Sequence, residues 1–438
     1  PRQVGLLDAL LADREFQANA EFAAARGRLS KLSTTPEPAE PPKGFQGTLR
    51  PYQREGLGWL YFLRELGLGG CLADDMGLGK TVQTLALLLH DRDERRRQRQ
   101  PRRPALVVVP RSLVHNWQAE AERFTPDLKV VEHRGPRRAT KAGPLRKADL
   151  VVTTYGTLRR DILLLKDIEF SVVILDESQA IKNASTESAK AARLLRGELR
   201  LGLSGTPVEN RLSELWSLFS FLEPGLLGGA TAFTKVAQRL RGGDAAVEEL
   251  ARVLRPLMLR RTKGQVAADL PPRVEQVLRC ELEGKARERY DELREHYRRS
   301  LLDSRGGLGS RVKILEGLLR LRQAACHPGL IDKEHADELP SAKLDLLEDR
   351  LEGAIRDGHK ALIFSQFTQL LGLLRRRLDA RGIVYEYLDG RTRKRAERVE
   401  RFQTDDDCPI FLISLKAGGF GLNLTAADYV FLLDPWWN

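Results

Sequence analysis

A short apolar segment, a glycine-rich turn and a Lys-Thr pair follow one another at residues 69–81. Gly77 and Gly79 let the backbone bend so that several N–H groups point at one spot, and the apolar run that follows predicts a helix whose positive dipole end adds to that spot. Lys80 would bring a full charge to the β- and γ-phosphates of a nucleotide, and Thr81 would hold Mg²⁺ through its hydroxyl. The order strand, loop, helix therefore predicts a phosphate-binding loop.

This loop departs from the usual pattern G-x-x-x-x-G-K-[ST], because Asp74 stands at the first glycine position. An ordinary glycine turn before a helix would explain the stretch taken alone. A second stretch argues against that reading: the apolar run 172–175 predicts a strand buried on both faces, and it ends in Asp176-Glu177. Two acids at the end of such a strand could be an Asp that binds a metal ion and a Glu that activates water. The alternative is an ordinary acidic loop after a core strand. Both motifs, in the expected order, favour a nucleotide site.

The composition describes a globular chain with a basic balance. Its 438 residues predict two or three domains, with 42% hydrophobic and 30% charged residues. The net charge of +12 favours a polyanionic partner, nucleic acid before anionic membrane. No apolar run approaches the roughly 20 residues that span a bilayer, so we expect no membrane association. We expect an intracellular protein, cytoplasmic and nucleoid-associated in a bacterium or nuclear in a eukaryote.

The four cysteines form neither a disulfide framework nor a zinc pattern, because no C-x-x-C pair occurs among them. Cys326-His327 has the residue types of a ligand pair, but buried structural use is the simpler interpretation. Nothing in the sequence requires a metal other than Mg²⁺.

Strands and helices alternate in two parts of the chain, which predicts parallel sheets wrapped by helices. The predicted strands of the first part are 105–109, 150–154, 171–175 and 199–203, and those of the second part are 361–364, 384–388, 409–414 and 429–433. Between about residues 209 and 339 we expect helical insertions without strands. The charged run 91–103 is typical of a solvated loop, and DNA contact is the alternative.

Other polar residues lie near the expected strand ends. Ser204 and Thr206 could sense the γ-phosphate or couple it to the next segment, although an ordinary polar turn would look the same. Gln53 leads into an amphipathic helix that precedes the phosphate-loop strand, and it could read an adenine edge or be a surface polar residue. A second glycine-rich loop, 416–423, follows a strand of the second part.

Together these motifs resemble the Swi/Snf-type ATPases of helicase superfamily two, whose motor is a pair of RecA-like lobes with ATP between them. Residues 74–88 resemble motif I of that family, and residues 176–179 resemble motif II, with Gln179 in place of the usual His, which puts in doubt only the coupling role of that residue. Residues 203–224 resemble motif III and an extension that is characteristic of this family rather than of helicases generally. The blocks 259–271 and 321–328 resemble its linker, and 361–367, 387–392 and 413–438 resemble its second-lobe motifs.

The resemblance covers residues 45–438 and implies an α/β fold of two RecA-like lobes with parallel sheets and helical insertions between them. The expected parts are a helical N-terminal segment with a proline-rich linker (1–44), lobe one (45–222), helical insertions and inter-lobe linker (223–340), and lobe two (341–438). The last family motif, which carries arginines that reach ATP, would follow Asn438, so we expect lobe two to be incomplete. If the polypeptide ends there, we expect turnover to be slower by at least roughly a hundredfold.

The same resemblance implies roles for single residues. Lys80, Thr81 and Asp176 would hold Mg·ATP, Glu177 would activate water, and Gln53 would read adenine. The remaining expectations are nucleotide contact by Gly77, Gly79, Gly419 and Asn423; coupling by Gln179, Ser204 and Thr206; and DNA contact by Arg111, Thr154, Tyr155, Gln366, Arg391 and Lys416.

The implied function is that of a monomeric motor with ATP and Mg²⁺ as cofactors. It would move along double-stranded DNA and remodel or displace a DNA-bound protein of unknown identity without separating the strands. One alternative is a strand-separating helicase, against which the motif III extension and the helical insertions argue. The other is an ATP-gated DNA-binding scaffold with little hydrolysis, which the absent last motif allows.

Overall fold

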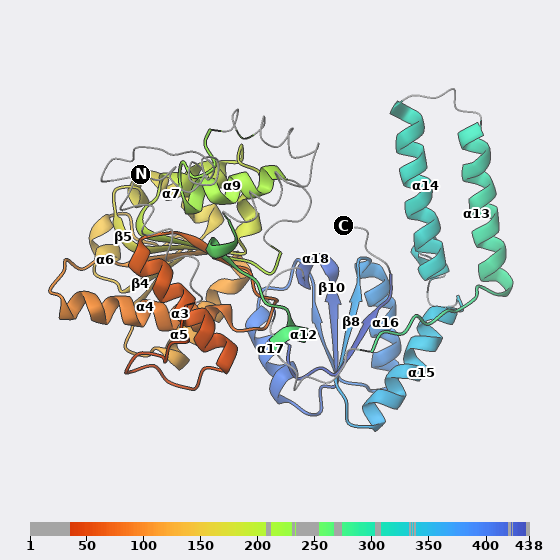
Figure 1. The fold of residues 1–438 in the computed structure, drawn as a ribbon. Coiled ribbons are helices and arrows are strands. Elements are labelled where there is room, and N and C mark those ends of the chain that lie inside the picture. The colour runs from red at the N-terminus through yellow and green to blue at the C-terminus, as the bar shows by residue number, and fades with distance from the viewer. Residues whose placement is uncertain are drawn as a thin grey trace. The chain divides into compact units, whose positions relative to one another are not determined.

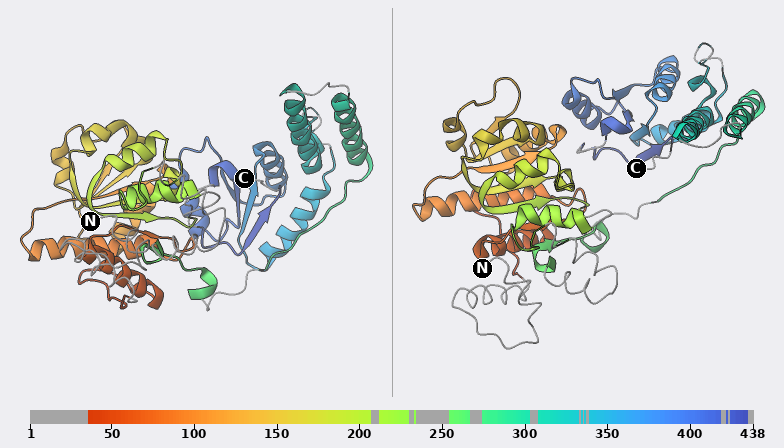
Figure 2. Two further views of the ribbon diagram at one scale, coloured as in Figure 1. Left: turned by 45° about the horizontal axis from the view of Figure 1, so that its top comes forward. Right: turned by 90° about the horizontal axis from the view of Figure 1, so that it is seen from above.

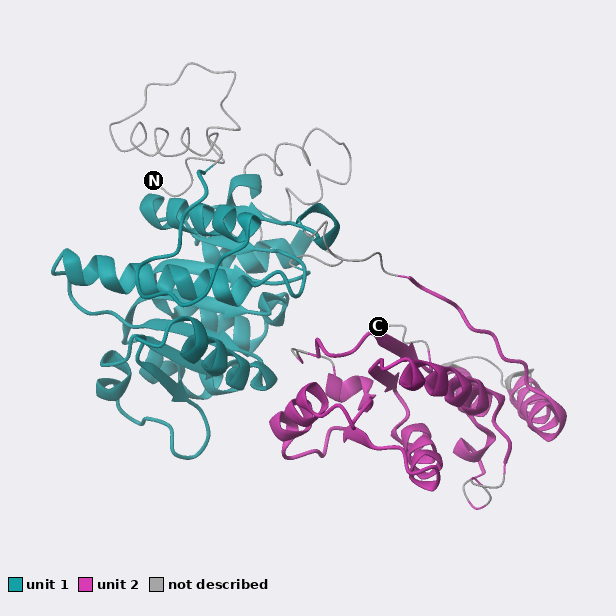
Figure 3. Cartoon of the chain, turned by 90° about the horizontal axis from the view of Figure 1, so that it is seen from below, with its two compact units in different colours: residues 1–272 teal, residues 273–438 magenta. Residues whose placement is uncertain are grey.

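The computed structural model describes residues 36–206, 212–229, 233, 254–266, 274–302, 308–332, 334, 336, 339–418, 422 and 424–434. The chain forms two compact units, residues 1–272 and 273–438, and each has its own parallel sheet (Figure 3). Within the described residues, no helix is both long enough and apolar enough to cross a membrane.

The first unit is built on a parallel sheet of seven strands in the order β3-β4-β2-β5-β6-β1-β7. The strands are β1 (Gly70–Leu72), β2 (Ala105–Val109), β3 (Val130–His133), β4 (Leu150–Thr154), β5 (Glu169–Asp176), β6 (Arg196–Leu203) and β7 (Met258–Leu259). Strands β2 and β4 are buried along their whole length, and β5 is buried after its first residue, so continuous apolar runs predict all three. Because the strands are parallel, the loops after β1, β5 and β6 meet at one edge of the sheet.

Helices cover both faces of this sheet, with α3, α4 and α5 on one face and α7 and α9 on the other (Figure 1). The helices are α3 (Pro51–Leu66), α4 (Lys80–Arg97), α5 (Val114–Phe124), α6 (Ala142–Arg146), α7 (Tyr155–Leu165), α8 (Glu187–Leu194), α9 (Leu212–Leu222) and α12 (Lys263–Val266). Short 3-10 turns are η2 (Arg111–Leu113), η3 (Ser178–Ile181) and η4 (Arg255–Leu257). One hydrophobic core fills both sides of the sheet, with Trp117, Phe170 and Phe219 fully buried.

Two strands of the first sheet differ from the expectation. The sequence does not predict the edge strand β3, and the expectation of a strand-free chain over 209–339 is wrong at β7. Two residues are too few to carry a periodic pattern. Strand β7 is held instead by parallel pairing of Met258 with Cys71 and by a hydrogen bond from Ala73 N to Leu259 O (2.7 Å).

The charged run 91–103, expected as a solvated loop, is mostly helical because α4 continues to Arg97. Arg95 is buried and pairs with Asp91 one turn earlier (3.3 Å) and with Glu198 on β6. The sequence of this run does not indicate that Glu198, on the distant strand β6, pairs with it. Those partners let the last turns of the helix pack on the sheet.

The second unit contains a parallel sheet of four strands in the order β11-β8-β10-β9. Its strands are β8 (Ala361–Ser365), β9 (Tyr385–Leu388), β10 (Ile410–Ser414) and β11 (Tyr429–Leu432). Its helices are α13 (Gly284–Leu302), α14 (Leu308–Cys326), α15 (Ala342–Arg356), α16 (Thr368–Ala380), α17 (Arg395–Thr404) and α18 (Leu415–Gly418), with a 3-10 turn η5 (Pro328–Leu330). Helices α15 and α16 share a core with one face of the sheet, and α17 and α18 share a core with the other.

Helices α13 and α14 lie side by side as a hairpin (Figure 2). The turn that ends α14 buries both residues of the Cys326-His327 pair. His327 Nδ1 accepts a hydrogen bond from Gly329 N (2.9 Å), which places the imidazole in the start of η5. The side chains therefore have a structural position, and no group of three metal-ligating side chains occurs in the described parts of the chain.

Candidate active site

The phosphate loop joins β1 to α4 through two residues in the left-handed backbone region. Gly77 has φ of +86° and Gly79, the residue before α4, has φ of +77°. A Cβ at Gly79 would overlap Gln53 Nε2, so both the backbone angle and the close approach require glycine there. Gln53 Nε2 donates to Leu78 O (3.2 Å), which places the predicted adenine reader directly against the loop.

Lys80 lies across this loop. Its Nζ donates to the carbonyl oxygens of Asp74 (2.6 Å) and Asp75 (3.2 Å). Burial lowers the pKa of Lys80, while the negative charges of Asp176 and Asp74 oppose that shift. The ammonium group is therefore held at the loop by neutral carbonyl oxygens, which an anionic phosphate can replace with a stronger interaction.

The departure at Asp74 has a partner that the sequence does not reveal. Asp74 is fully buried, and Arg261 donates to it from the backbone N (3.1 Å), from Nε (3.0 Å) and from Nη2 (2.5 Å). Arg261 also donates to Gln83 Oε1 (3.0 Å) and to Tyr52 O. Residues 259–261 of the predicted linker block thus lie at the base of the loop, where Arg261 holds the Asp74 side chain with a fork of hydrogen bonds.

The acids after β5 are held in an unusual geometry. Trp117 Nε1 donates to Asp176 Oδ2 (2.7 Å), and Glu177 N donates to Asp176 Oδ1 (2.9 Å). Burial raises the pKa of Asp176 to about 6, although the hydrogen bond from Trp117 opposes the shift. Glu177 has φ of +49°, which is rare outside glycine and is a form of strain found at functional sites. The sequence gives no signal for Trp117, which lies on α5.

A chain of hydrogen bonds connects Glu177 to the loop after β6. Gln179 Nε2 donates to Glu177 Oε2 (2.6 Å), and the Ser204 hydroxyl donates to Gln179 Oε1 (2.9 Å). Thr206 N then donates to Ser204 Oγ (3.0 Å). The two ends of the Gln179 amide therefore bridge the Glu177 carboxylate and the Ser204 hydroxyl, and they connect the loops after β5 and β6.

Two protein families match this chain. The SNF2-related domain matches residues 52–330, and the helicase conserved C-terminal domain matches residues 342–438. The chain belongs to the SNF2-related family. This confirms the resemblance stated from the sequence motifs.

Relatives of this SNF2-related chain come from bacteria and eukaryotes. A Bacillus subtilis protein named as an ATP-dependent helicase/translocase, YwqA, is 39% identical over 455 residues, covering 99% of this chain and 48% of its own length. The human SWI/SNF-related matrix-associated actin-dependent regulator of chromatin subfamily A member 1 is 36% identical, with 90% of this chain and 39% of its own length covered. The TATA-binding protein-associated factor MOT1 of Saccharomyces cerevisiae is 31% identical, with 99% and 27% covered. This chain therefore spans about half or less of these relatives.

The SWI2/SNF2 ATPase core of Sulfolobus solfataricus, solved in complex with double-stranded DNA, matches 92% of this chain and 85% of its own. The sequence identity is 34% and the TM-score is 0.51. This match confirms the expected fold class of two α/β lobes with parallel sheets.

The residues predicted to contact DNA in the first SNF2-related unit lie at strand ends. Arg111 is exposed in η2 after β2. Thr154 caps α7, because its Oγ1 accepts from Thr157 N (3.2 Å). The hydroxyl of Tyr155 donates to Asp176 O (2.8 Å), so it contacts the acid loop inside the protein.

In the second unit, Arg391 and Lys416 are exposed at the ends of β9 and β10, and Gln366 N is held by the Asp434 carboxylate (3.0 Å) after β8. Gly419 and Asn423 lie outside the described residues, and their nucleotide contacts stay predictions. The basic helix α17 begins at Arg395, so Arg391 and Thr392 lie before it. The Asp389 carboxylate accepts from Arg391 N (2.9 Å) and the Thr392 hydroxyl (3.0 Å) and holds these residues in a turn.

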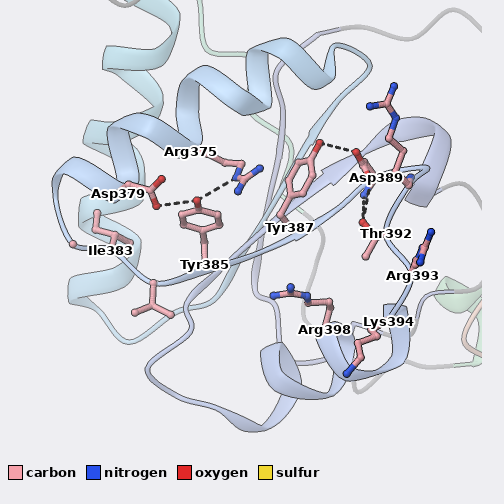
Figure 4. Close-up of a pocket in the computed structure, with 13 residues that line it drawn as sticks. Arg375, Asp379, Ile383, Tyr385, Tyr387, Asp389, Thr392, Arg393, Lys394 and Arg398 are labelled. Atoms are coloured by element: carbon pink, nitrogen blue, oxygen red, sulfur yellow. Dashed lines mark hydrogen bonds between the residues drawn. The ribbon is translucent and has the colours of Figure 1, made fainter.

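A pocket of about 810 Å³ lies beside this turn (Figure 4). The Arg375 guanidinium lies over the rings of Tyr387 (4.7 Å) and Tyr385 (5.8 Å). Arg391 and Arg393 complete a cationic rim that the sequence motif indicates only in part. Cationic and aromatic side chains together are typical of surfaces that meet nucleic acid.

Proposed function

We propose that this chain is the motor of an ATP-driven translocase that moves along double-stranded DNA and remodels protein–DNA complexes without separating the strands. The observation that carries the proposal is the hydrogen-bonded connection from Glu177 through Gln179 to Ser204, beside a phosphate loop, in a member of the SNF2-related family. It gives the water-activating acid a direct mechanical link to a neighbouring loop.

The residues present fit Mg·ATP. Thr81 and Asp176 would hold Mg²⁺, which supplies charge neutralisation of the phosphates when bound. Lys80 would leave the loop carbonyl oxygens for the β- and γ-phosphates, and Gln53 would contact adenine. Glu177 would orient and deprotonate the attacking water, and loss of its hydrogen bond with Gln179 would transmit the change to Ser204.

Duplex DNA is the proposed track because the chain carries a net charge of +12 and places Arg111, Arg391 and Lys416 exposed at strand ends. The related Sulfolobus core was solved with double-stranded DNA, and the yeast relative is named for its association with a TATA-binding protein. A DNA-bound protein is therefore the proposed target. We propose lobe one at 45–222, helical insertions at 223–340 and lobe two at 341–438, working as one monomeric motor.

We expect duplex DNA to stimulate ATP turnover at least about tenfold, because track binding completes the coupled state of the motor. The measurement is steady-state phosphate release with and without duplex DNA, followed by a strand-displacement assay on a forked duplex. Turnover that ignores DNA would support the scaffold alternative. Strand displacement during turnover would support the helicase alternative, and either result would contradict the proposal.

We expect DNA affinity to fall steeply with salt and to vary little with base sequence, because the contacts are with phosphates. Each phosphate contact contributes a slope of about −0.9 in log K against log salt concentration. Fluorescence anisotropy on two unrelated duplexes, over a series of salt concentrations, measures both quantities. The substitution Arg391→Gln should make the slope shallower by about one contact, and Arg350→Gln on α15 serves as a control. A tenfold preference between the two duplexes at one salt concentration would show base reading instead.

A further inference from the structure

Helix α5 directs two side chains toward the nucleotide site, and the proposed mechanism uses neither. Trp117 is fully buried and donates to Asp176 Oδ2 (2.7 Å). Glu120 follows three residues later on the same helix, and residues at this spacing share one face. Asn116 Nδ2 donates to Glu120 Oε1 (3.0 Å) and sets the direction of the carboxyl group.

The other oxygen of this carboxyl group has no such partner. Glu120 Oε2 is enclosed, and no hydrogen-bond donor in the described part of the chain satisfies it. Helix α5 packs against α4, which begins at Lys80-Thr81, and Trp117, one turn before Glu120, donates to Asp176. Burial raises the pKa of Glu120, the charge of Asp176 adds to that shift, and the Thr81 side chain opposes it. The two residues that would hold Mg²⁺ are therefore both neighbours of Glu120.

Without a cation nearby, a charged Glu120 carboxylate in this position is unfavourable in free energy. An enclosed carboxylate oxygen loses its water, and the nearby Asp176 repels a second negative charge. Burial and the charge of Asp176 raise the pKa of Glu120, and the charge of Arg123 opposes them. A hydrated divalent ion between Thr81 and Asp176 would supply both positive charge and water donors, because Mg²⁺ usually keeps several of its waters in proteins.

We infer that Glu120 is a positioning residue for Mg²⁺, with Oε2 accepting a hydrogen bond from a water on the ion that Thr81 and Asp176 would hold. The inference rests on the proposed function, because it needs Mg·nucleotide at this loop. Oε1 stays bound to Asn116, so Glu120 orients the hydration shell and does not join the direct ligands.

The test is the Mg²⁺ dependence of nucleotide binding in the Glu120→Gln variant. Glutamine keeps the size of the side chain and an oxygen that can accept from Asn116, but it removes the charge. We expect the Mg²⁺ concentration for half-maximal binding of a fluorescent ADP analogue to rise about tenfold, since outer-shell partners of metals typically contribute 10- to 100-fold in affinity. Binding measured without Mg²⁺ should not change. Glu122→Gln, at an exposed position of the same helix, is the matched control and should behave as wild type.

Each outcome has a separate meaning. A loss of affinity that is equal with and without Mg²⁺ would show that Glu120 only shapes the loop around Thr81, and the inference would fail. An unchanged Mg²⁺ profile would also overturn it, while Mg²⁺-dependent binding by wild type would leave the proposed nucleotide site intact. If wild type itself binds nucleotide without any Mg²⁺ dependence, both the inference and the proposed metal site are wrong. Glu120→Asp, which keeps the charge on a shorter side chain, should restore part of the Mg²⁺ affinity if Gln folds poorly.

Discussion

Glu177→Gln is expected to slow ATP turnover by about 10²- to 10⁴-fold, while tight Mg·ATP binding is kept. Glutamine has the size of glutamate and can still accept from Gln179 through its amide oxygen, but it cannot take a proton from water. The variant Lys80→Ala should have the opposite effect, on binding and not on the chemical step. Lys80→Ala removes the charge that faces the phosphates, so we expect binding itself to be lost.

Both variants are measured by equilibrium binding of a fluorescent ATP analogue and by single-turnover hydrolysis. Glu187→Gln, exposed on α8 of the same unit, is the control for loss of one acidic side chain. Hydrolysis by Glu177→Gln at the wild-type rate would remove Glu177 from the proposed role. Loss of binding in both variants would indicate instead that the left-handed turn at Glu177 had rearranged.

The second large effect is expected on stability. Arg261→Met leaves the fully buried Asp74 carboxylate without its cation, and we expect a loss of about 3–5 kcal/mol in the free energy of unfolding of the first unit. Removal of both charges together should cost much less, because no charge is then left buried alone. The double variant Arg261→Met/Asp74→Asn is therefore expected to recover most of the stability.

Urea unfolding of the four proteins in this double-mutant cycle gives the interaction free energy directly. Arg260→Met, at the exposed neighbouring position, controls for the loss of an arginine from this segment. If Arg260→Met costs as much as Arg261→Met, the segment is sensitive for another reason. If the double variant is no more stable than Arg261→Met, the ion pair is not the source of the effect.

Much of the fold was predictable because its signals are local. The apolar runs of β2, β4 and β5 are buried, and runs of that kind predict strands of a parallel sheet. The bend of the loop before α4 was predictable because glycine is favoured where φ is positive, as at Gly77 and Gly79. These features depend on a few consecutive residues, so the sequence displays them directly.

The sequence by itself therefore determined the family, the α/β class, the order of the motifs, and the place of the glycine-rich loop before α4 and of the acids at the end of β5. Only the tertiary structure decided which distant side chains complete them: Arg261 at Asp74 and Trp117 at Asp176. A buried acid implies that a partner exists, but 187 residues separate Asp74 from Arg261, and no pattern in the chain marks one arginine among many. That choice depends on the packing of β7 beside β1 and of α5 beside β4, which bring the partners together because the sheet is buried and its polar groups must be satisfied.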